Sequence, residues 1–276
     1  MDVRRLVRRG LNLAGVLALI ATAAEAQARV AGSAATGQAR GVPAGSAAAA
    51  LAAADSAYAR RDVPGALASY LAVIAADSAN YVALWKASRA EVDLAEAARR
   101  GPAMDSLLMS AQRHAEAAIQ LRPTDAEGHF ALARALGRRA LSVGTMDRIR
   151  YAKVIRAEAL EALKYDSIHA GALHVLGMWH AEIMRVNGLA RAFARTFLGA
   201  QVFGLASWDE AQRLLEEAVR VDPNRIVHRL DLAGIYADRG ERDKARALYE
   251  SIATAPITEP NDDLYKRQAA ERLRRL

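Results

Sequence analysis

Apolar residues recur at every third and fourth position of this chain from Ala47 onward. That is the period of an α-helix, in which residues three and four apart lie on the same face. No long stretch alternates apolar and polar residues at every second position, as a half-buried strand would. The pattern therefore predicts an all-α fold without strands.

A repeated pattern appears when the second helix of each predicted helix pair is aligned. The clearest copy has the small, aromatic and turn residues of a tetratricopeptide repeat: Leu232, Ala233, Tyr236, Gly240, Ala245, Tyr249 and Ile252. Two more copies share its internal spacing and end at a proline: Ala211, Leu215, Ala218 and Pro223, and Ala111, Ala115, Ala118 and Pro123. Two fainter copies are Ala66, Tyr70, Val73 and Ser78, and Ile155, Ala159, Ala162 and Ser167.

The small residues of these copies have a mechanical role in the predicted fold. Two antiparallel helices pack closely only where one side chain is short, and a neighbouring aromatic ring fills the space beside it. We therefore expect a tetratricopeptide-like solenoid of about five helix pairs over residues 47–276. The middle copies lie farther apart than the standard period, which predicts lengthened helices or loops there. After Pro256, the run Asn261-Asp262-Asp263 can cap a last helix that ends at Leu276.

Composition agrees with helices and narrows the chemistry. Alanine dominates, whereas four Phe and three Trp are few for a β-sandwich. The chain has no Cys, which excludes disulfides, thiolate metal sites and a cysteine nucleophile. The formal net charge of +7 includes four arginines in the first ten residues, so the excess in the remaining chain is mild. We do not expect nucleic-acid binding from it.

The first residues have the order of a secretory signal peptide. Four arginines precede an apolar run from Leu11 to Ala24, and small residues follow at Ala26 and Ala28. We predict a signal peptide over residues 1–26, cleaved after Ala26 or Ala28, with export by the general or the twin-arginine route to the periplasm or the exterior. The run is short for a membrane-spanning helix, so an uncleaved anchor is the weaker alternative. Residues 27–46, rich in Ala and Gly, predict a flexible linker.

One part of the chain resembles a known protein family. Leu176, Gly177, Trp179 and Glu182 form a Leu-Gly-x-Trp-x-x-Glu core. With the insertion that follows, the repeat that starts at Trp208 and the ending from Pro256, this core resembles the regulator of microtubule dynamics proteins. The resemblance implies a curved tetratricopeptide domain without catalytic activity, associated in some members with organelle membranes and with lipid binding or transfer. An exported bacterial protein would meet no microtubule, so we do not expect microtubule binding.

Catalytic and metal sites are not indicated by the sequence. His169, His174 and His180 lie near Glu182, but His174 and His180 are six residues apart, whereas a helical metal pair needs a spacing of three or four. We interpret His180 as a core histidine, and Glu182 as a hydrogen-bonding or ion-pair partner of Arg185 or of a neighbouring helix. No nucleophile elbow, phosphate loop or dinucleotide fingerprint is present. We therefore predict no enzyme activity, no cofactor and no metal.

Candidate binding residues come from the inward positions of the first helix in each pair. They are Trp85, Arg89, Phe130, Arg134, Arg138, His174, Met178, Glu182, Arg185 and Leu230. This mixture suits an extended peptide whose carboxylates bind the arginines, or an acyl chain with an anionic head group. The alternative is that a tightly curled solenoid packs these side chains against one another. We predict a scaffold for a protein or peptide, and a carrier of a hydrophobic ligand such as a lipid is the second hypothesis.

The segment between Asn187 and Ser207 is the other unusual part. Leu189, Phe193 and Phe197 recur at helical spacing, interleaved with Arg191 and Arg195, so one face is apolar and the other cationic. Packing across the opening of the solenoid is the common use of such a helix. Contact with a lipid or a membrane surface through the three apolar residues is the functional alternative.

Overall fold

The computed structural model describes residues 44–276. The predicted signal peptide and most of the predicted linker lie outside the described residues. Within residues 44–276 the chain forms twelve α-helices, one short 3-10 helix and no strand, which confirms the predicted all-α fold. In chain order the elements are α2 (Ala44–Ala59), α3 (Val63–Ala76), α4 (Tyr81–Ala97), α5 (Pro102–Leu121), α6 (Ala126–Arg139), α7 (Thr145–Tyr165), α8 (Ala170–Arg185), α9 (Gly188–Phe197), η2 (Gln201–Leu205), α10 (Trp208–Val221), α11 (Ile226–Asp238), α12 (Arg242–Thr254) and α13 (Asp262–Arg274). None of these helices is long and apolar enough to cross a membrane.

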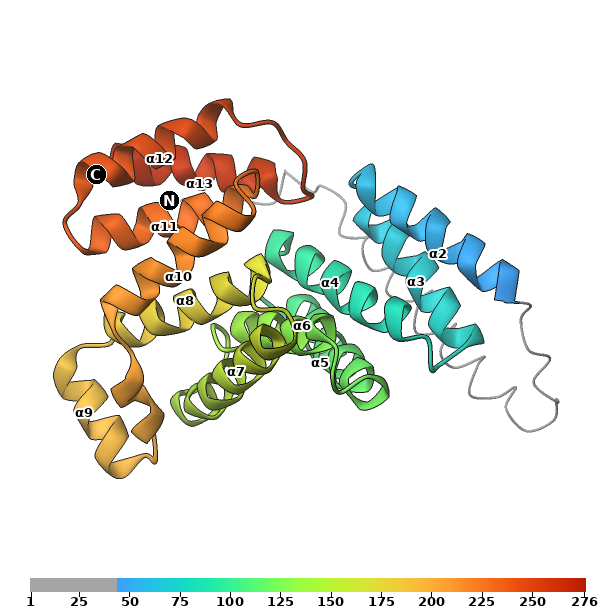
Figure 1. The fold of residues 1–276 in the computed structure, drawn as a ribbon, viewed down its shortest axis with the longest axis horizontal. Helices are drawn as coiled ribbons and strands as arrows, with labels where there is room; N and C mark the ends of the chain where they lie inside the picture. The colour runs from blue at the N-terminus through green and yellow to red at the C-terminus, as the bar shows by residue number, and fades with distance from the viewer. Residues whose placement is uncertain (1–43) are drawn as a thin grey trace, which may run out of the picture. The chain divides into compact units, whose positions relative to one another are not determined.

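Five helix pairs follow one another along the described chain. They are α2 with α3, α4 with α5, α6 with α7, α8 with α10, and α11 with α12. The second helix of each pair carries one copy of the predicted repeat, so the helical-repeat prediction is confirmed. Figure 1 shows the succession from the blue α2 to the red α13, which packs on α11 and α12 as the last helix. The insertion forms α9 and η2, and α8 therefore pairs with α10.

Polar residues fix where several helices begin. The side chain of Asp62 accepts a hydrogen bond from the backbone N–H of Gly65, and that of Asn80 accepts one from Ala83. Ser207 does the same for Glu210 at the start of α10. Each of these bonds satisfies an N–H group that has no partner within the first turn of its helix.

The Leu-Gly-x-Trp segment holds α8 closely between two neighbouring helices. A Cβ atom on Gly177 would lie 3.0 Å from Cγ of Leu215 and 3.2 Å from the carbonyl oxygen of Ala211, so glycine permits the close approach of α8 to α10. On the other side the buried Trp179 donates its Nε1–H to the carbonyl oxygen of Ala152 in α7, at 2.7 Å. The segment that carries the family resemblance is therefore the part of α8 that joins two repeats.

His180 is buried and ties the insertion to the repeats. Burial lowers the pKa of His180, so the ring is neutral and its Nδ1 accepts a hydrogen bond of 3.2 Å from the backbone N–H of Ser207. Its neighbour Trp179 belongs to a buried cluster that also contains Ala194 of α9 and Phe203 of η2. Both the histidine and the cluster hold the inserted segment against α7 and α8.

Replacement of Ala211 or Ala218 by Leu should overpack the contact between α8 and α10. Both alanines are fully buried, and Ala211 faces Gly177. We expect each variant to lower the free energy of unfolding by about 1–3 kcal/mol. Ala157→Leu, at an exposed position of α7, is the matched control and should change stability by less than about 0.5 kcal/mol. Chemical denaturation compares the three variants, and equal stabilities would show that the assigned repeat register is wrong.

Candidate functional site

The first helices of the last four repeats surround a large cavity. Its volume is about 2260 Å³, and its wall includes residues of α4, α6, α8, α11 and α13. Pockets for small molecules usually have volumes of roughly 300–1,000 Å³. The cavity is therefore large enough for a long or bulky ligand.

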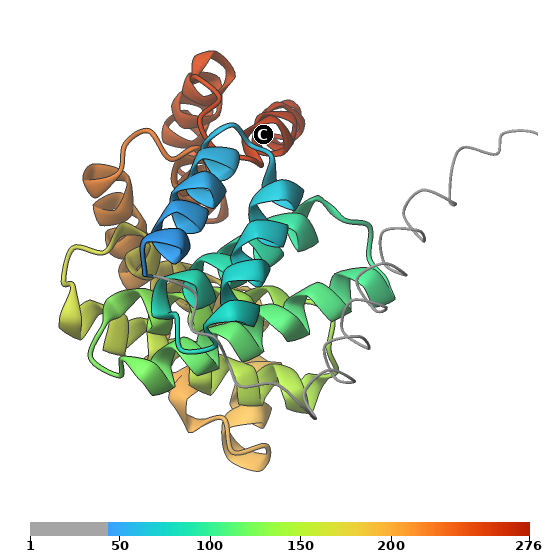
Figure 2. The ribbon, with the colours of Figure 1, turned by 90° about the vertical axis from the view of Figure 1, so that its right-hand side faces the viewer.

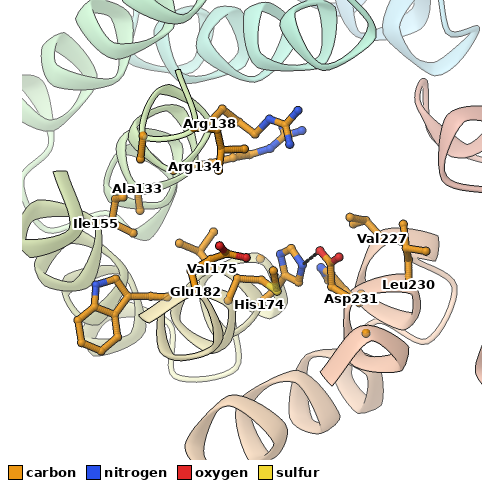
Figure 3. A pocket seen from close by; sticks show the side chains of 18 of the residues that line it. Ala133, Arg134, Arg138, Ile155, His174, Val175, Glu182, Val227, Leu230 and Asp231 are labelled. Atoms are coloured by element: carbon orange, nitrogen blue, oxygen red, sulfur yellow. Dashed lines mark hydrogen bonds and ion pairs between the residues drawn. The ribbon is translucent and has the colours of Figure 1, made fainter. Parts of the chain in front are cut away.

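All ten candidate binding residues lie on the wall of this cavity. Their helices are α4 for Trp85 and Arg89, α6 for Phe130, Arg134 and Arg138, α8 for His174, Met178, Glu182 and Arg185, and α11 for Leu230. Figure 3 shows Arg134 and Arg138 on one side of the open space and His174, Glu182 and Leu230 on another. Leu230 is only 1% exposed, so it contributes mainly to packing. The residues chosen from the repeat pattern thus lie around one cavity.

One part of the wall is polar, and its arginines are already paired. Nη2 of Arg134 lies 2.6 Å from Oδ1 of Asp93, and Nε of Arg138 lies 3.3 Å from Oε1 of Glu96. Burial by itself would lower the pKa of Arg134, but Asp93 and Glu96 beside it raise that pKa above its usual value. Arg134 therefore stays charged, and acidic residues of the neighbouring α4 hold both arginines in place.

The C-terminal segment closes the array of helices onto α4. Asn261 donates its side-chain N–H to the carbonyl oxygen of Asp93 at 3.0 Å and to Oε2 of Glu96 at 3.2 Å. The hydroxyl of Tyr265 donates to the same oxygen of Glu96. Asn261 occupies the N-cap position of α13, as its sequence suggested, but its side chain does not cap that helix. The buried acceptors on α4 take its donors instead. We call these contacts of Asn261 and Tyr265 with Asp93 and Glu96 the clasp.

A second polar group lies between α8 and α11. Nε2 of His174 is 3.0 Å from Oδ2 of Asp231, as the dashed line in Figure 3 shows. Burial by itself would raise the pKa of Asp231, but the hydrogen bond with His174 and the positive charges nearby lower it. Arg185 pairs with Glu182, as predicted, and its Nη2 also lies 2.7 Å from Oδ2 of Asp238. The pairs of His174 with Asp231 and of Arg185 with Asp238 join α8 to α11 of the next repeat.

Another part of the wall is apolar. We call this part the apolar wall. Its side chains come from α7, α8, α9 and the segment directly after α9, and they are Ile149, Ala152, Ile155, Val175, Met178, Trp179, Ile183, Leu189, Ala190, Phe193, Ala194, Leu198 and Phe203. Phe130 adds an aromatic ring from α6, packed against the ring of His169 at a centroid distance of 4.6 Å. A ligand in this cavity would therefore meet charged groups on one part of the wall and only apolar groups on another.

The arrangement suits binding by shape and apolar contact. Pairing uses only some of the five N–H donors of each arginine, so the polar part of the wall can still bind a ligand's acceptors. Within residues 44–276 no group of three or more His, Cys, Asp or Glu side chains is placed to hold a metal ion.

Sequence reasoning missed the partners of the arginines and the clasp. Asp93 lies one helical turn after Arg89 on the inward face of α4, and Glu96 lies about one turn further, so the helical period alone could have included both. Asn261 and Tyr265 carried no such signal, because their contact with α4 joins residues about 170 positions apart.

Loss of the Tyr265 hydroxyl should weaken the clasp. A hydrogen bond to a charged group contributes about 1.5–3 kcal/mol. Tyr265→Phe should therefore lower the free energy of unfolding by a similar amount, and it should speed hydrogen exchange in α13. The matched control is Tyr236→Phe, which removes an exposed hydrogen bond to Glu216 between adjacent helices and should cost less than about 1 kcal/mol. If the two variants lose equal stability, the clasp is no stronger than a surface contact.

Stability should fall in mild acid because of His228. This ring is 3% exposed on α11, and burial, with a smaller effect of nearby His174, lowers its pKa from the usual 6.5 to about 2. The unfolded chain binds a proton at His228 below about pH 6.5 and the folded chain does not, so the stabilisation is complete above that pH and is lost as the pH falls. His228→Gln should reduce the loss between pH 7 and pH 5 by about 2 kcal/mol. Denaturation curves at pH 7 and pH 5 measure this loss of stability in the wild type and in His228→Gln. Equal losses in the two proteins would contradict the prediction.

Comparisons with known proteins agree with the fold. The family model described as regulator of microtubule dynamics protein 1-3 matches residues 50–276. Among solved structures, the thermophilic tetratricopeptide protein TTC0263 of Thermus thermophilus is 18% identical, with 82% of this chain and 98% of that chain covered and a TM-score of 0.60. MamA from Desulfovibrio magneticus RS-1 is 12% identical, with 74% and 92% covered and a TM-score of 0.45. The sequence itself matched no curated protein.

Proposed function

This chain belongs to the regulator of microtubule dynamics protein 1-3 family, and on that premise we propose that it is a non-catalytic binding module that holds a segment of a partner protein in its central cavity. The observation that carries the proposal is the cavity of about 2260 Å³, whose wall contains every candidate residue chosen from the repeat register. Helical-repeat solenoids commonly bind partners on their concave surface. The fold shared with a tetratricopeptide protein supports the same role.

The two parts of the wall favour an amphipathic segment. Apolar side chains of the segment would lie against Phe130, Met178 and the rest of the apolar wall. Its polar groups would face Arg134 and Arg138, whose remaining donors are available although both arginines are paired. A helical segment satisfies its own backbone hydrogen bonds and can enter an apolar groove without the cost of unpaired polar groups.

A carrier of a hydrophobic ligand such as a lipid is the second candidate. One observation favours it: α7, α8 and α9 contribute many apolar side chains to the wall of the cavity. A hydrocarbon chain needs no hydrogen-bond partner there, whereas an extended peptide does. Mass spectrometry of organic extracts of the purified protein distinguishes the candidates, because a carrier should retain a ligand and a scaffold should not.

Removal of apolar bulk from the cavity should weaken binding and leave the fold intact. Peptides selected from a displayed library for binding to the wild-type protein should bind Phe130→Ala and Met178→Ala at least about tenfold more weakly, as for central interface residues. Both side chains are half-buried, so melting should change little.

Tyr249→Ala is the comparison variant for stability. Tyr249 is buried between α11 and α12, and its truncation should cost about 3–5 kcal/mol. If Phe130→Ala melts as early as Tyr249→Ala, the Phe130 surface is core. If both cavity variants bind the selected peptides as well as the wild-type protein, the peptide proposal fails, and a ligand in the organic extract would then favour the carrier.

A further inference from the structure

The inserted helix α9 carries more apolar surface than the body of the protein covers. Ala194 belongs to the buried cluster that contains Trp179 and Phe203, and Leu198, one turn later, is partly buried against that cluster. Leu189, Phe193 and Phe197 follow one another at intervals of four residues on the adjacent part of the helix surface. They are 84%, 55% and 71% exposed. We call these three residues the α9 stripe.

The α9 stripe is unusual for this protein. Among the described residues, Leu189 is the most exposed large apolar side chain. The rings of Phe193 and Phe197 lie against each other with centroids 5.0 Å apart, which makes one continuous apolar ridge. Leu205 of η2, in the same insertion, is also exposed. In Figures 1 and 2, α9 lies at the lower edge of the described helices, where nothing in that part of the chain covers it.

The charges around the stripe are positive. From Ile183 to Trp208 the chain contains Arg185, Arg191 and Arg195 and no acidic residue. Nη1 of Arg191 lies within hydrogen-bond distance of the carbonyl oxygens of Ile183, Met184 and Val186, so these contacts leave its charge in place. Lys153 of α7 reaches the turn at Gly199 between α9 and η2. A partner of the stripe should therefore be apolar and carry negative charge beside its apolar part.

The size of the stripe favours a bilayer over a folded protein. Its first and last residues are eight residues apart on the helix, which corresponds to about 12 Å. A stable protein interface buries about 800 Å² on each partner, far more than three side chains supply. An interfacial helix needs only an apolar face that enters the boundary of head groups and acyl chains by about 5–10 Å, with basic residues at the head groups.

We propose that α9 docks this protein on the surface of an anionic bilayer. Leu189, Phe193 and Phe197 insert between the lipids, and Arg195 and Lys153 contact the anionic head groups. Leu189 and Phe193 also lie on the cavity wall, so docking brings the apolar wall to the bilayer surface. This docking does not depend on whether a protein segment or an apolar ligand occupies the cavity.

Vesicle flotation of the full chain tests the proposal. The wild-type protein should float with vesicles made of phosphatidylcholine and phosphatidylglycerol in equal parts, and much less with pure phosphatidylcholine. The combined variant Leu189→Gln, Phe193→Gln and Phe197→Gln should lose at least nine-tenths of the bound fraction. Met109→Gln, which changes an exposed apolar residue on α5, should float like the wild type. Every variant keeps the same N-terminal residues, so their contribution cancels in the comparison.

Insertion can be read at a single position because the chain has no Cys. Phe197→Cys, labelled with an environment-sensitive dye, should shift to shorter emission wavelength on addition of the anionic vesicles, and Met109→Cys should not. Lys153→Gln with Arg195→Gln should reduce flotation with anionic vesicles and leave the melting temperature unchanged.

Three outcomes would overturn the proposal. Equal flotation of the wild type and the α9 variant would show that the stripe does not bind the membrane. An unchanged emission at position 197 would exclude insertion. Size-exclusion chromatography in which the wild type is dimeric and the α9 variant is monomeric would show that a second copy of the chain covers the stripe instead.

Discussion

Two acidic residues of α4 hold the array of repeats in place: the carboxylate of Glu96 and the backbone carbonyl of Asp93 bind the C-terminal segment, and the carboxylate of Asp93 binds helices on either side of α4. A buried carboxylate is costly unless it is paired and hydrogen-bonded. Here the partners come from elements far apart in the chain: Tyr58, Arg134, Asn261 and Tyr265. Glu96 receives the donors of Asn261 and Tyr265 only when the C-terminal segment lies beside α4. The cost of burying Glu96 therefore favours an array that returns onto itself, and the cavity results from that closure.

The same electrostatic constraint shapes what the cavity can recognise. Each of Arg134, Arg138 and Arg185 is paired with an acidic residue of a neighbouring helix. These pairs restrict the side chains and make much of the wall part of the structure. A ligand that displaced them would leave buried carboxylates without partners, which is unfavourable. Recognition therefore rests mainly on the shape of the cavity and on its apolar wall. Charge contributes less than it would if the arginines had no acidic partners.

The insertion connects the cavity with the outer surface. Ala194 and Phe203 complete the buried cluster around Trp179, whereas Leu189 and Phe193 lie both on the cavity wall and in contact with solvent. A single short helix thus closes the apolar wall and presents an apolar ridge outside it. Because α8 pairs with α10 despite the insertion, the repeats keep their packing and the inserted segment is free to differ from them.

Local properties of the sequence determined the helices, their pairing and the residues that face inward. The helical period, the small residues of the second helices and the turn residues act over a few positions, and the small residues of all five repeat copies lie on second helices. The inward register follows from the same period, so it placed Trp85, Phe130 and Met178 on one cavity wall. Only the tertiary structure decided how far the array curves, because the curvature is a sum of small rotations between repeats that no local pattern records. That sum brings Tyr265 to Glu96, gives the arginines their acidic partners, and leaves the α9 stripe exposed.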